Sequence, residues 1–172
     1  DYKILAIIPS KGKPVTYNGK FLLEKTISTA KKSKYIDEIV VSTDNKVSAK
    51  IAKSNGALVP FIRPSFLSRP QTETIDVLAY TIKHLERKKK YFDLIVVLTD
   101  GYPFRSKEIV DTMIERLMEE GSDTLIAAKK ESRGIWLSEK NKINLINDPS
   151  TPRGLKQKHA YITLFGLCCV TH

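Results

Sequence analysis

Cysteine is scarce in this sequence. Its 172 residues include two cysteines, Cys168 and Cys169, which are adjacent and lie in an apolar run from 164 to 170. Adjacent cysteines rarely bridge each other, and two are too few for a disulfide-stapled scaffold, so that class of small secreted protein is excluded. We interpret both as free thiols in a buried strand, and we expect a reducing, cytoplasmic location.

Long apolar runs and a leader segment are also missing. No run approaches the roughly 20 residues that a membrane helix needs, and no basic stretch followed by an apolar one opens the chain. We therefore expect neither a signal peptide nor a membrane partner. Apolar residues make up 41% and charged residues 28% of the chain, the balance of an ordinary globular domain.

Acidic residues are outnumbered by basic ones, and the formal net charge is +10. A basic chain can bind nucleic acid, an anionic surface or small anionic substrates. Aromatic residues, 8% of the chain, are not interleaved with the basic ones as a single-strand-binding platform would need. The lysines instead follow helix faces and loops, so we favour small anionic substrates over nucleic acid.

Several common active-site motifs are absent as well. The sequence holds neither the glycine-lysine spacing of a Walker A loop nor the G-x-G-x-x-G of a dinucleotide loop. The three histidines have no metal-binding spacing, and no serine-histidine-aspartate or cysteine-histidine arrangement stands out. No metal hydrolase or triad hydrolase is indicated.

What the sequence does contain is a regular alternation of short apolar runs and amphipathic segments. The apolar runs predict buried strands, and the segments with helical spacing predict helices. The predicted strands cover residues 4–8, 36–42, 57–59, 94–98 and 124–128, and the predicted helices cover 21–34, 47–54, 72–90 and 106–120. This alternation predicts a Rossmann-like α/β fold, in which a mostly parallel sheet carries helices on both faces.

The third predicted helix has Thr72 as its candidate N-cap. Its apolar stripe is predicted to consist of Ile75, Leu78, Ala79, Ile82 and Leu85.

The pattern changes after residue 128. Residues 129–157 are polar, with strand-like pieces at 136–137 and 143–146, and residues 161–170 return as a strand. We treat 1–172 as a single domain in which 129–160 forms an excursion from the sheet, either a hairpin or a dimerisation arm.

Parallel sheets bind ligands beyond the carboxyl ends of their strands, so the loops that follow the strands form the candidate site. The first loop, from Ser10 through Lys11 and Gly12 to Lys13, offers backbone N–H and ammonium groups to a phosphate. An ordinary solvated loop has the same composition, and both interpretations stay open here.

Two aspartates follow predicted strands. Asp100 comes directly after the most apolar strand and is placed to hold Mg²⁺ beside a polyphosphate, since Mg²⁺ favours one or two carboxylates plus phosphate oxygens. A simple Asp100-Gly101 turn is the alternative. Asp44 and Asn45, in the second loop, are interpreted as turn or cap residues before the next helix. The arginines that lie in loops, where they can bind phosphate or carboxylate, are Arg63, Arg69, Arg105, Arg133 and Arg153.

Six segments in this order are typical of one family. They are LAIIP at 5–9, NGK at 18–20, SKYIDEIVVSTDN at 33–45, IAKSNGALVPFIRP at 51–64, TIDVLAYTI at 74–82, and DLIVVL at 93–98 with PFR at 103–105. The stretch from Tyr35 to Pro64 is the most specific. Over nearly its whole length the chain resembles the acylneuraminate cytidylyltransferases, also called CMP-sialic acid synthetases.

The resemblance implies a fold of the nucleotide-diphospho-sugar transferase type and a reaction. CTP and a 2-keto-3-deoxy sugar acid, sialic acid or a related nonulosonic acid, would give the CMP-sugar and pyrophosphate, with Mg²⁺ as the cofactor. It also implies a homodimer, for which residues 129–160 would supply the arm.

Roles for individual residues follow from the same resemblance. The cations expected to act on the phosphates during catalysis are Lys11, Lys13 and Lys20. The residues expected to bind the nucleotide are Ser10, Gly12, Arg63, Thr72 and Thr74. The residues expected to bind the sugar acid are Thr99, Arg105 and Arg153. Asp100 has no counterpart in the family, and its metal role rests on its position alone.

The chain departs from the family in two loops. Its first loop is several residues shorter, and Thr99-Asp100-Gly101-Tyr102 replaces the usual Gln-Pro-Thr-Ser, so that Tyr102 is expected to crowd the site. The altered loop favours a second hypothesis, a related nucleotidyltransferase of other specificity, for example for an eight-carbon acid. The short loop favours a third, a non-catalytic relative that binds a nucleotide.

Overall fold

The computed structural model describes residues 2–106, 108–146, 150–152, 155 and 160–172. The chain divides into two compact units, one that extends to Ile126 and includes Phe165–His172, and one formed by Ala127–Leu164. The predicted excursion, 129–160, lies within the second unit, and its role in dimerisation stays a prediction. Within the described ranges, no helix is both long and apolar enough to cross a bilayer.

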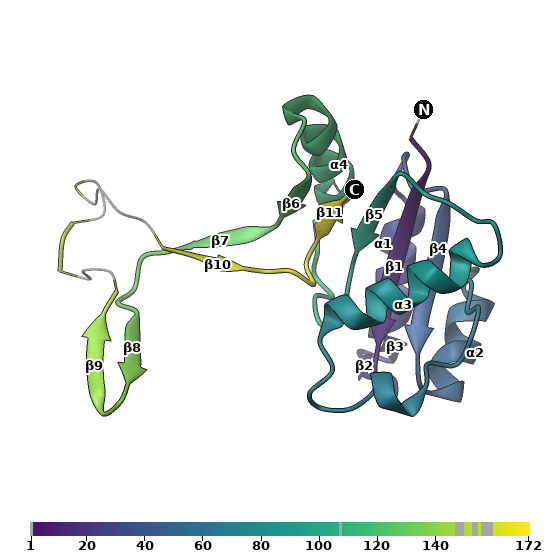
Figure 1. The fold of residues 1–172 in the computed structure, drawn as a ribbon, viewed down its shortest axis with the longest axis horizontal. Coiled ribbons are helices and arrows are strands. Elements are labelled where there is room, and N and C mark those ends of the chain that lie inside the picture. The colour runs from purple at the N-terminus through teal and green to yellow at the C-terminus, as the bar shows by residue number, and fades with distance from the viewer. Residues whose placement is uncertain (1, 107, 147–149, 153–154, 156–159) are drawn as a thin grey trace. The chain divides into compact units, whose positions relative to one another are not determined.

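The first unit is built around a five-stranded sheet (Figure 1). Its strands, in spatial order, are β4 (Glu38–Thr43), β1 (Ile4–Ser10), β5 (Leu94–Val97), β11 (Cys169–Thr171) and β6 (Thr124–Ile126). β1 is parallel to β4 and β5, whereas β11 is antiparallel to β5 and β6. The predicted α/β fold with a mostly parallel sheet is confirmed.

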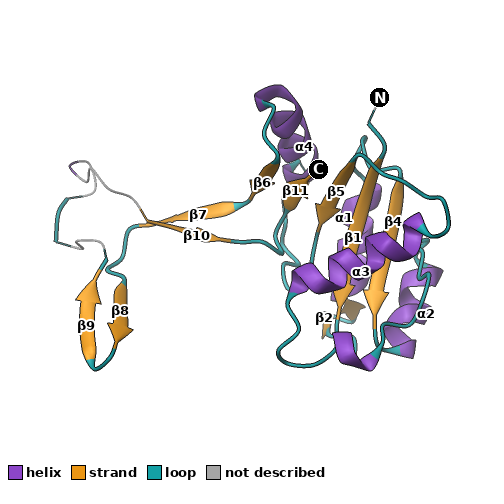
Figure 2. Cartoon of the chain, viewed as in Figure 1, coloured by secondary structure: helices purple, strands orange, loops and turns teal. Residues whose placement is uncertain are grey.

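Helices cover both faces of this sheet. They are α1 (Leu22–Lys31), α2 (Lys46–Ser54), α3 (Thr74–Glu86) and α4 (Ile109–Glu120), with a short 3₁₀ turn at Ser65–Leu67. α3 crosses one face of the sheet and α1 lies behind it (Figure 2). The hydroxyl of Tyr35, just beyond α1, donates to a carboxylate oxygen of Glu115 in α4 at 2.7 Å, so these two helices are tied together.

The core explains why the central strands are apolar without alternation. Leu5 and Ile7 of β1 pack under α3 against Leu78 and Leu85, while the alternate residues of the strand are buried on the opposite face. A strand with helices on both sides has no polar face, so its sequence is a continuous apolar run rather than an alternation of apolar and polar residues.

Helix boundaries shift where side chains find other partners. Asn45, not Asp44, caps α2 by accepting hydrogen bonds from the backbone N–H groups of Val47 and Ser48. Thr72 does not cap α3, which begins at Thr74, because its hydroxyl donates to the carbonyl of Phe66. The prediction of Asn45 as a cap is therefore confirmed, and the predicted caps Asp44 and Thr72 are wrong.

The predicted stripe of α3 is wrong in part. Ile75 is 60% exposed, and Ala79 is also exposed. The residues of α3 that are buried are Val77, Leu78, Thr81 and Leu85.

Three predicted strands are shorter or divided. Residues 57–59 join the sheet through a single isolated bridge, between Leu58 and Val40, because Pro60 has no N–H to extend the ladder. The predicted strand 124–128 becomes β6 and β7 (Ala128–Glu131), and the predicted strand 161–170 becomes β10 (Ala160–Thr163) and β11. Both divisions fall where the chain passes between the two units.

A short hairpin occupies part of the predicted loop 10–20. β2 (Thr16–Tyr17) pairs with β3 (Lys20–Phe21), and the turn between them places Asn18 and Gly19 at φ values of 49° and 72°. Asn-Gly is the residue pair that such a left-handed two-residue turn favours.

The second unit consists of two-stranded ribbons. β7 pairs with β10, and β8 (Trp136–Glu139) pairs with β9 (Lys142–Leu145), antiparallel in both cases. Every residue of β8 and β9 is exposed.

Candidate functional site

The carboxyl ends of β1, β4 and β5 lie at one edge of the sheet because the three strands are parallel. β1 ends at Ser10, β4 ends at Thr43 just before Asp44, and Thr99 and Asp100 follow β5. The three predicted loops are thereby brought together, as the parallel topology requires.

The end of β1 and the loop after β5 are joined by a hydrogen bond. The Ser10 hydroxyl donates to Oδ2 of Asp100 at 2.9 Å. This contact orients the Asp100 carboxylate across the end of β1, and Ser10 itself is 2% exposed. Asp100 is therefore held in place and is more than a turn residue.

Asp44 fixes the first loop rather than capping a helix. Its Oδ1 accepts a hydrogen bond from the backbone N–H of Gly12 at 2.8 Å, and the Ser48 hydroxyl donates to the Gly12 carbonyl at 3.3 Å. Gly12 has a φ of 72°, a conformation that favours glycine. The loop is thus an ordered structure tied to the start of α2.

Arg63 lies beneath the same loop. Its side chain is 3% exposed, its Nη2 donates to the Ser10 carbonyl at 3.3 Å, and the same nitrogen lies 3.9 Å from Oδ1 of Asp44. Burial lowers the pKa of the Arg63 guanidinium, and the charge of Asp44 acts in the opposite direction. The carboxylate of Asp44 is too far from the Arg63 guanidinium for a hydrogen bond, so this buried cation can still attract a further anion.

These elements surround a pocket of about 290 Å³. It carries three cationic side chains, one carboxylate and three threonine hydroxyls over a small apolar base. The lining residues are Pro9, Lys11, Arg63, Leu67, Arg69, Thr72, Thr74, Val77, Thr99 and Asp100. The surplus of cations over carboxylates suits a polyanion such as a nucleotide polyphosphate.

Six of the predicted site residues line this pocket and others do not. Ser10 bonds to the lining residue Asp100, whereas Gly12 bonds to Asp44, and neither Gly12 nor Asp44 is in the lining. Lys13 is exposed outside the lining set, and Lys20, on β3, lines a separate depression with Arg105. Arg153 lies outside the described residues.

Arg105 is engaged by the backbone of its own unit. Its guanidinium donates to the carbonyls of Leu167 at 2.6 Å, Gly166 at 2.6 Å and Tyr102 at 3.0 Å, and also to the carbonyl of Thr99. Burial lowers its pKa to about 10. This network makes Arg105 a clamp that holds the loop after β5, which places it behind the pocket wall rather than in the lining.

Tyr102 packs away from the pocket. It is absent from the pocket lining, and a Cβ placed on Gly166 would lie 3.0 Å from its ring. The same Cβ would lie 2.2 Å from Oγ1 of Thr99, so only glycine fits at 166. The predicted crowding of the site by Tyr102 is not what the structure shows, because the ring turns toward 166.

Metal-binding capacity in the pocket rests on Asp100. Among the residues that the structure describes, no three histidine, cysteine, aspartate or glutamate side chains gather as a metal centre would require. Mg²⁺ needs less, since it is held by one or two carboxylates plus the phosphates of its substrate. Asp100 lines the pocket and uses Oδ2 for the bond to Ser10, and so fits the part of a single carboxylate ligand.

Two residues of this site escape prediction from the sequence. The sequence marks Arg69 only as a loop arginine, and its place in the lining depends on how the segment 60–72 folds across the sheet edge. Asp44 reads as a local cap because a helix follows it. Its partner, Gly12, is 32 residues away, a separation that local patterns cannot show.

Sequence comparison identifies relatives across most of the chain. A family described as Cytidylyltransferase matches residues 11–160. The pseudaminic acid cytidylyltransferase of Campylobacter jejuni is 27% identical over 158 residues, which cover 85% of this chain and 68% of that protein. The CMP-N,N'-diacetyllegionaminic acid synthase of Legionella pneumophila is 32% identical over 121 residues, which cover 66% of this chain and 52% of that protein.

Solved structures share the fold at low sequence identity. A CMP:2-keto-3-deoxy-manno-octonic acid synthetase complexed with CTP is 15% identical, with a TM-score of 0.68 over 99% of this chain and 74% of that one. The 4-diphosphocytidyl-2C-methyl-D-erythritol synthase of Anaerococcus prevotii is 18% identical, with a TM-score of 0.69 over 99% of this chain and 70% of that one.

Proposed function

Because this chain belongs to the cytidylyltransferase family, we propose that it transfers CMP from CTP to a nonulosonic sugar acid and releases pyrophosphate. The observation that carries the proposal is the pocket at the carboxyl ends of β1 and β5, where Lys11, Arg63 and Arg69 face Asp100. The names of the two relatives above, which act on pseudaminic and diacetyllegionaminic acid, support the choice of acid.

The phosphates of CTP occupy the cationic side of the pocket in this proposal. Lys11 and the backbone of the loop around Gly12 contact the phosphates, Arg63 supports the loop from beneath, and Thr72 and Thr74 lie beside the nucleotide. Lys13 and Lys20 lie outside the lining of this pocket, and their action on the phosphates stays a prediction. Cations placed where charge develops on the leaving pyrophosphate lower the barrier for its departure.

The reaction is a substitution at phosphorus. The oxygen of the anomeric hydroxyl forms a bond to the α-phosphorus while the bond from that phosphorus to the oxygen of the leaving pyrophosphate breaks, and the hydroxyl proton is released. Mg²⁺ held by Asp100 would neutralise charge on the phosphate oxygens when bound. The protein's own contribution is to hold the two substrates in the geometry that the reaction needs.

The sugar acid is assigned to the Thr99 side of the pocket. Thr99 lines it, and Arg105 holds the Thr99 carbonyl from behind. We therefore give Arg105 a positioning role in place of the predicted direct contact, and we retain Arg153 as the predicted partner of the sugar carboxylate.

We also propose a cytoplasmic homodimer. The second unit exposes large apolar side chains on both of its ribbons, and a chain that leaves such surface uncovered usually has a partner for it. The most exposed of those on the ribbons are Trp136 at 60%, Ile143 at 66% and Tyr161 at 62%. The two buried thiols support a reducing compartment.

Pyrophosphate release tests the proposed activity directly. The full-length protein is supplied with Mg²⁺, each of CTP, ATP, GTP and UTP, and a panel of nine-carbon and eight-carbon 2-keto-3-deoxy sugar acids. Release with CTP and a nine-carbon acid supports the proposal. A strong preference for an eight-carbon acid would instead support the second hypothesis, and no release from folded protein that still binds CTP would support the third.

A further inference from the structure

A second pocket lies away from the nucleotide pocket, on the sheet edge formed by residues 57–60. Its volume is about 500 Å³, within the range of small-molecule sites. The lining residues are Lys53, Gly56, Ala57, Leu58, Val59, Pro60, Leu85, Lys88 and Lys90. Lys88 and Lys90 lie in the segment between the end of α3 and the start of β5. This second pocket is therefore near the amino ends of the strands, whereas the nucleotide pocket is at their carboxyl ends.

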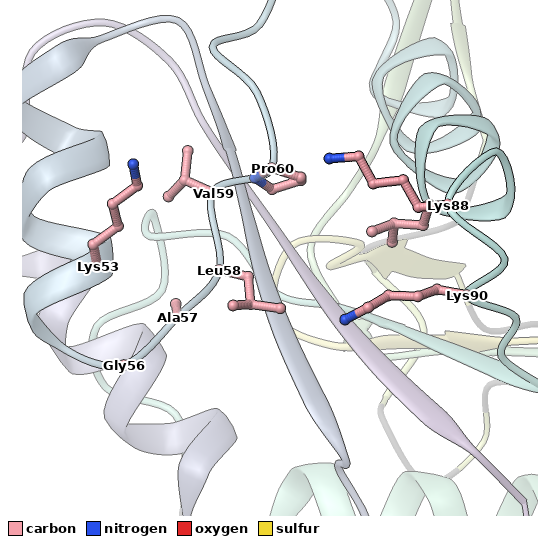
Figure 3. A pocket seen from close by; sticks show the side chains of 9 residues that line it. Lys53, Gly56, Ala57, Leu58, Val59, Pro60, Lys88 and Lys90 are labelled. Atoms are coloured by element: carbon pink, nitrogen blue, oxygen red, sulfur yellow. The ribbon is translucent and has the colours of Figure 1, made fainter.

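The pocket combines an apolar floor with amines on two sides. Figure 3 shows Lys53 on one side of the segment 57–60, and Lys88 and Lys90 on the other, where their amines point toward that segment. Leu58 is 45% exposed on the floor although both its N–H and its carbonyl bond to β4. An exposed leucine fixed in this way offers apolar surface without any need for rearrangement.

The amines are largely available for a ligand. Lys90 pairs with Glu38 at 2.8 Å. Across the part of the chain that the structure describes, no ion pair is formed by Lys53 or Lys88. The rim therefore carries positive charge that no carboxylate of the described chain neutralises.

Gly56 leaves room for a further amine close to the pocket. It has a φ of 79°, and a Cβ at this position would lie 2.8 Å from Nζ of Lys31. Lys31 lines an adjoining pocket of about 450 Å³ that shares Lys53 and Gly56 with this one. The glycine thus allows the amine of α1 to approach the segment that leads into the floor.

From this arrangement we propose that the pocket binds a small organic anion with an apolar ring or short chain. The apolar body would lie on Leu58, Pro60 and Leu85, and its acid group would be held by Lys88 or Lys53. The site is separate from the proposed nucleotide pocket, although the segment that forms its floor continues to Arg63.

The test uses 8-anilinonaphthalene-1-sulfonate, an aromatic sulfonate, as the probe in a fluorescence titration of the full-length protein. We expect saturable binding at one site. Lys53→Glu and Lys88→Glu should each weaken binding by about fivefold or more, because a favourable charge contact of about 1 kcal/mol is replaced by repulsion. Lys50→Glu on α2 and Lys83→Glu on α3 are matched controls outside the lining, and should change binding by less than about twofold.

Three outcomes would overturn the proposal. Equal binding in all four variants would show that the lysines of the rim do not hold the probe. Displacement of the probe by CTP would place it in the nucleotide pocket. A change of oligomeric state in Lys88→Glu, measured by light scattering, would make this face an interface between copies. Because Lys53 also lies in the last turn of α2, where a cation stabilises the helix, binding is compared where circular dichroism shows each variant folded.

Discussion

The two units of this chain use β-strands in opposite ways. In the first, β1 is buried along nearly its whole length between helices, and its sequence is a continuous apolar run. In the second, every residue of the β8–β9 hairpin is exposed, although Trp136, Leu137, Ile143 and Leu145 are as apolar as the residues of the core. Equal hydrophobicity therefore leads to burial only where helices are present to cover the strand.

This difference assigns the stability of the fold to the first unit and the proposed association of two chains to the second. The sheet unit has its own core, whereas a two-stranded ribbon without a covering layer is marginal in water. We expect substitutions in the sheet to act on folding, and substitutions in the second unit to act on the proposed homodimer.

The largest expected difference between the units is in thiol reactivity. Burial raises the pKa of Cys168 from 9.0 to about 12, which lowers its thiolate fraction at pH 8 by about 10³-fold. Burial raises the pKa of Cys169 to about 11. Cys168 should therefore react with an aromatic disulfide about 10³-fold more slowly, and Cys169 about 10²-fold more slowly, than a thiol introduced on the exposed hairpin by Ser138→Cys. Rapid labelling of the native pair in folded protein would mean that β11 opens readily.

Catalysis should depend on the sheet unit through Asp100. Asp100→Asn is expected to lower kcat/KM for pyrophosphate release by about 10²-fold and to raise the Mg²⁺ concentration for half-maximal rate, because one charged ligand is lost. Asp123→Asn, an exposed aspartate just before β6, is the control. An unchanged Mg²⁺ dependence in Asp100→Asn would remove the metal role of this residue.

Core truncation compares the units at one residue type. Ile7→Ala in β1 should reduce the free energy of unfolding by about 3 kcal/mol, since Ile7 is fully buried and a cavity remains. Ile143→Ala, at 66% exposure, should change it by less than ~0.5 kcal/mol. Urea denaturation measures both, and similar losses would contradict the division between a stable sheet and a ribbon without a core.

Replacing an arginine should also cost more free energy of unfolding in the first unit than in the second. Arg105→Lys should reduce the free energy of unfolding by about 2 kcal/mol, because a lysine cannot reach several carbonyls at once and leaves some unsatisfied. Arg133→Lys should reduce it by less, because the Arg133 side chain is 80% exposed and a lysine keeps a positive charge beside Glu131, whose side chain is 6% exposed. A large loss in Arg133→Lys alone would reverse the comparison.

The smallest expected effect is a twofold change in mass. Trp136→Ser combined with Ile143→Ser removes apolar surface from the second unit only, and should convert the proposed dimer to a monomer in light scattering. The unfolding midpoint of the monomer should stay close to that of Ile143→Ala. If the double variant keeps the native mass, another surface makes the dimer.

The sheet could be predicted from sequence because its strands are continuous apolar runs and its helices have helical spacing. The predictions were wrong where a residue's role depends on a contact with a residue far away in the sequence. Asp44 looks like a cap until Gly12 is known to lie beside it, and Thr72 looks like a cap until its hydroxyl meets Phe66. Residues 161–170 read as one strand because the sequence does not show that Gly166 turns against Thr99.

The candidate site followed the same rule. Lys11 and Asp100 were predicted from the loops that hold them, since the ends of parallel strands meet at one edge of the sheet, whereas Arg63 was predicted from the family resemblance. All three line the pocket. The clamp formed by Arg105 was not predicted, because it depends on Gly166 and Leu167, more than 60 residues along the chain.

The position of β11 has a consequence for synthesis. This strand lies inside the sheet, between β5 and β6, yet in chain order it follows the whole of the second unit. While the ribosome is still producing the second unit, β6 has no neighbour in the sheet, and Arg105 lacks the carbonyls of Gly166 and Leu167. The loop that carries Thr99 and Asp100 therefore gains the bonds from Thr99 and Arg105 to the carbonyls of Gly166 and Leu167 only after the second unit has emerged.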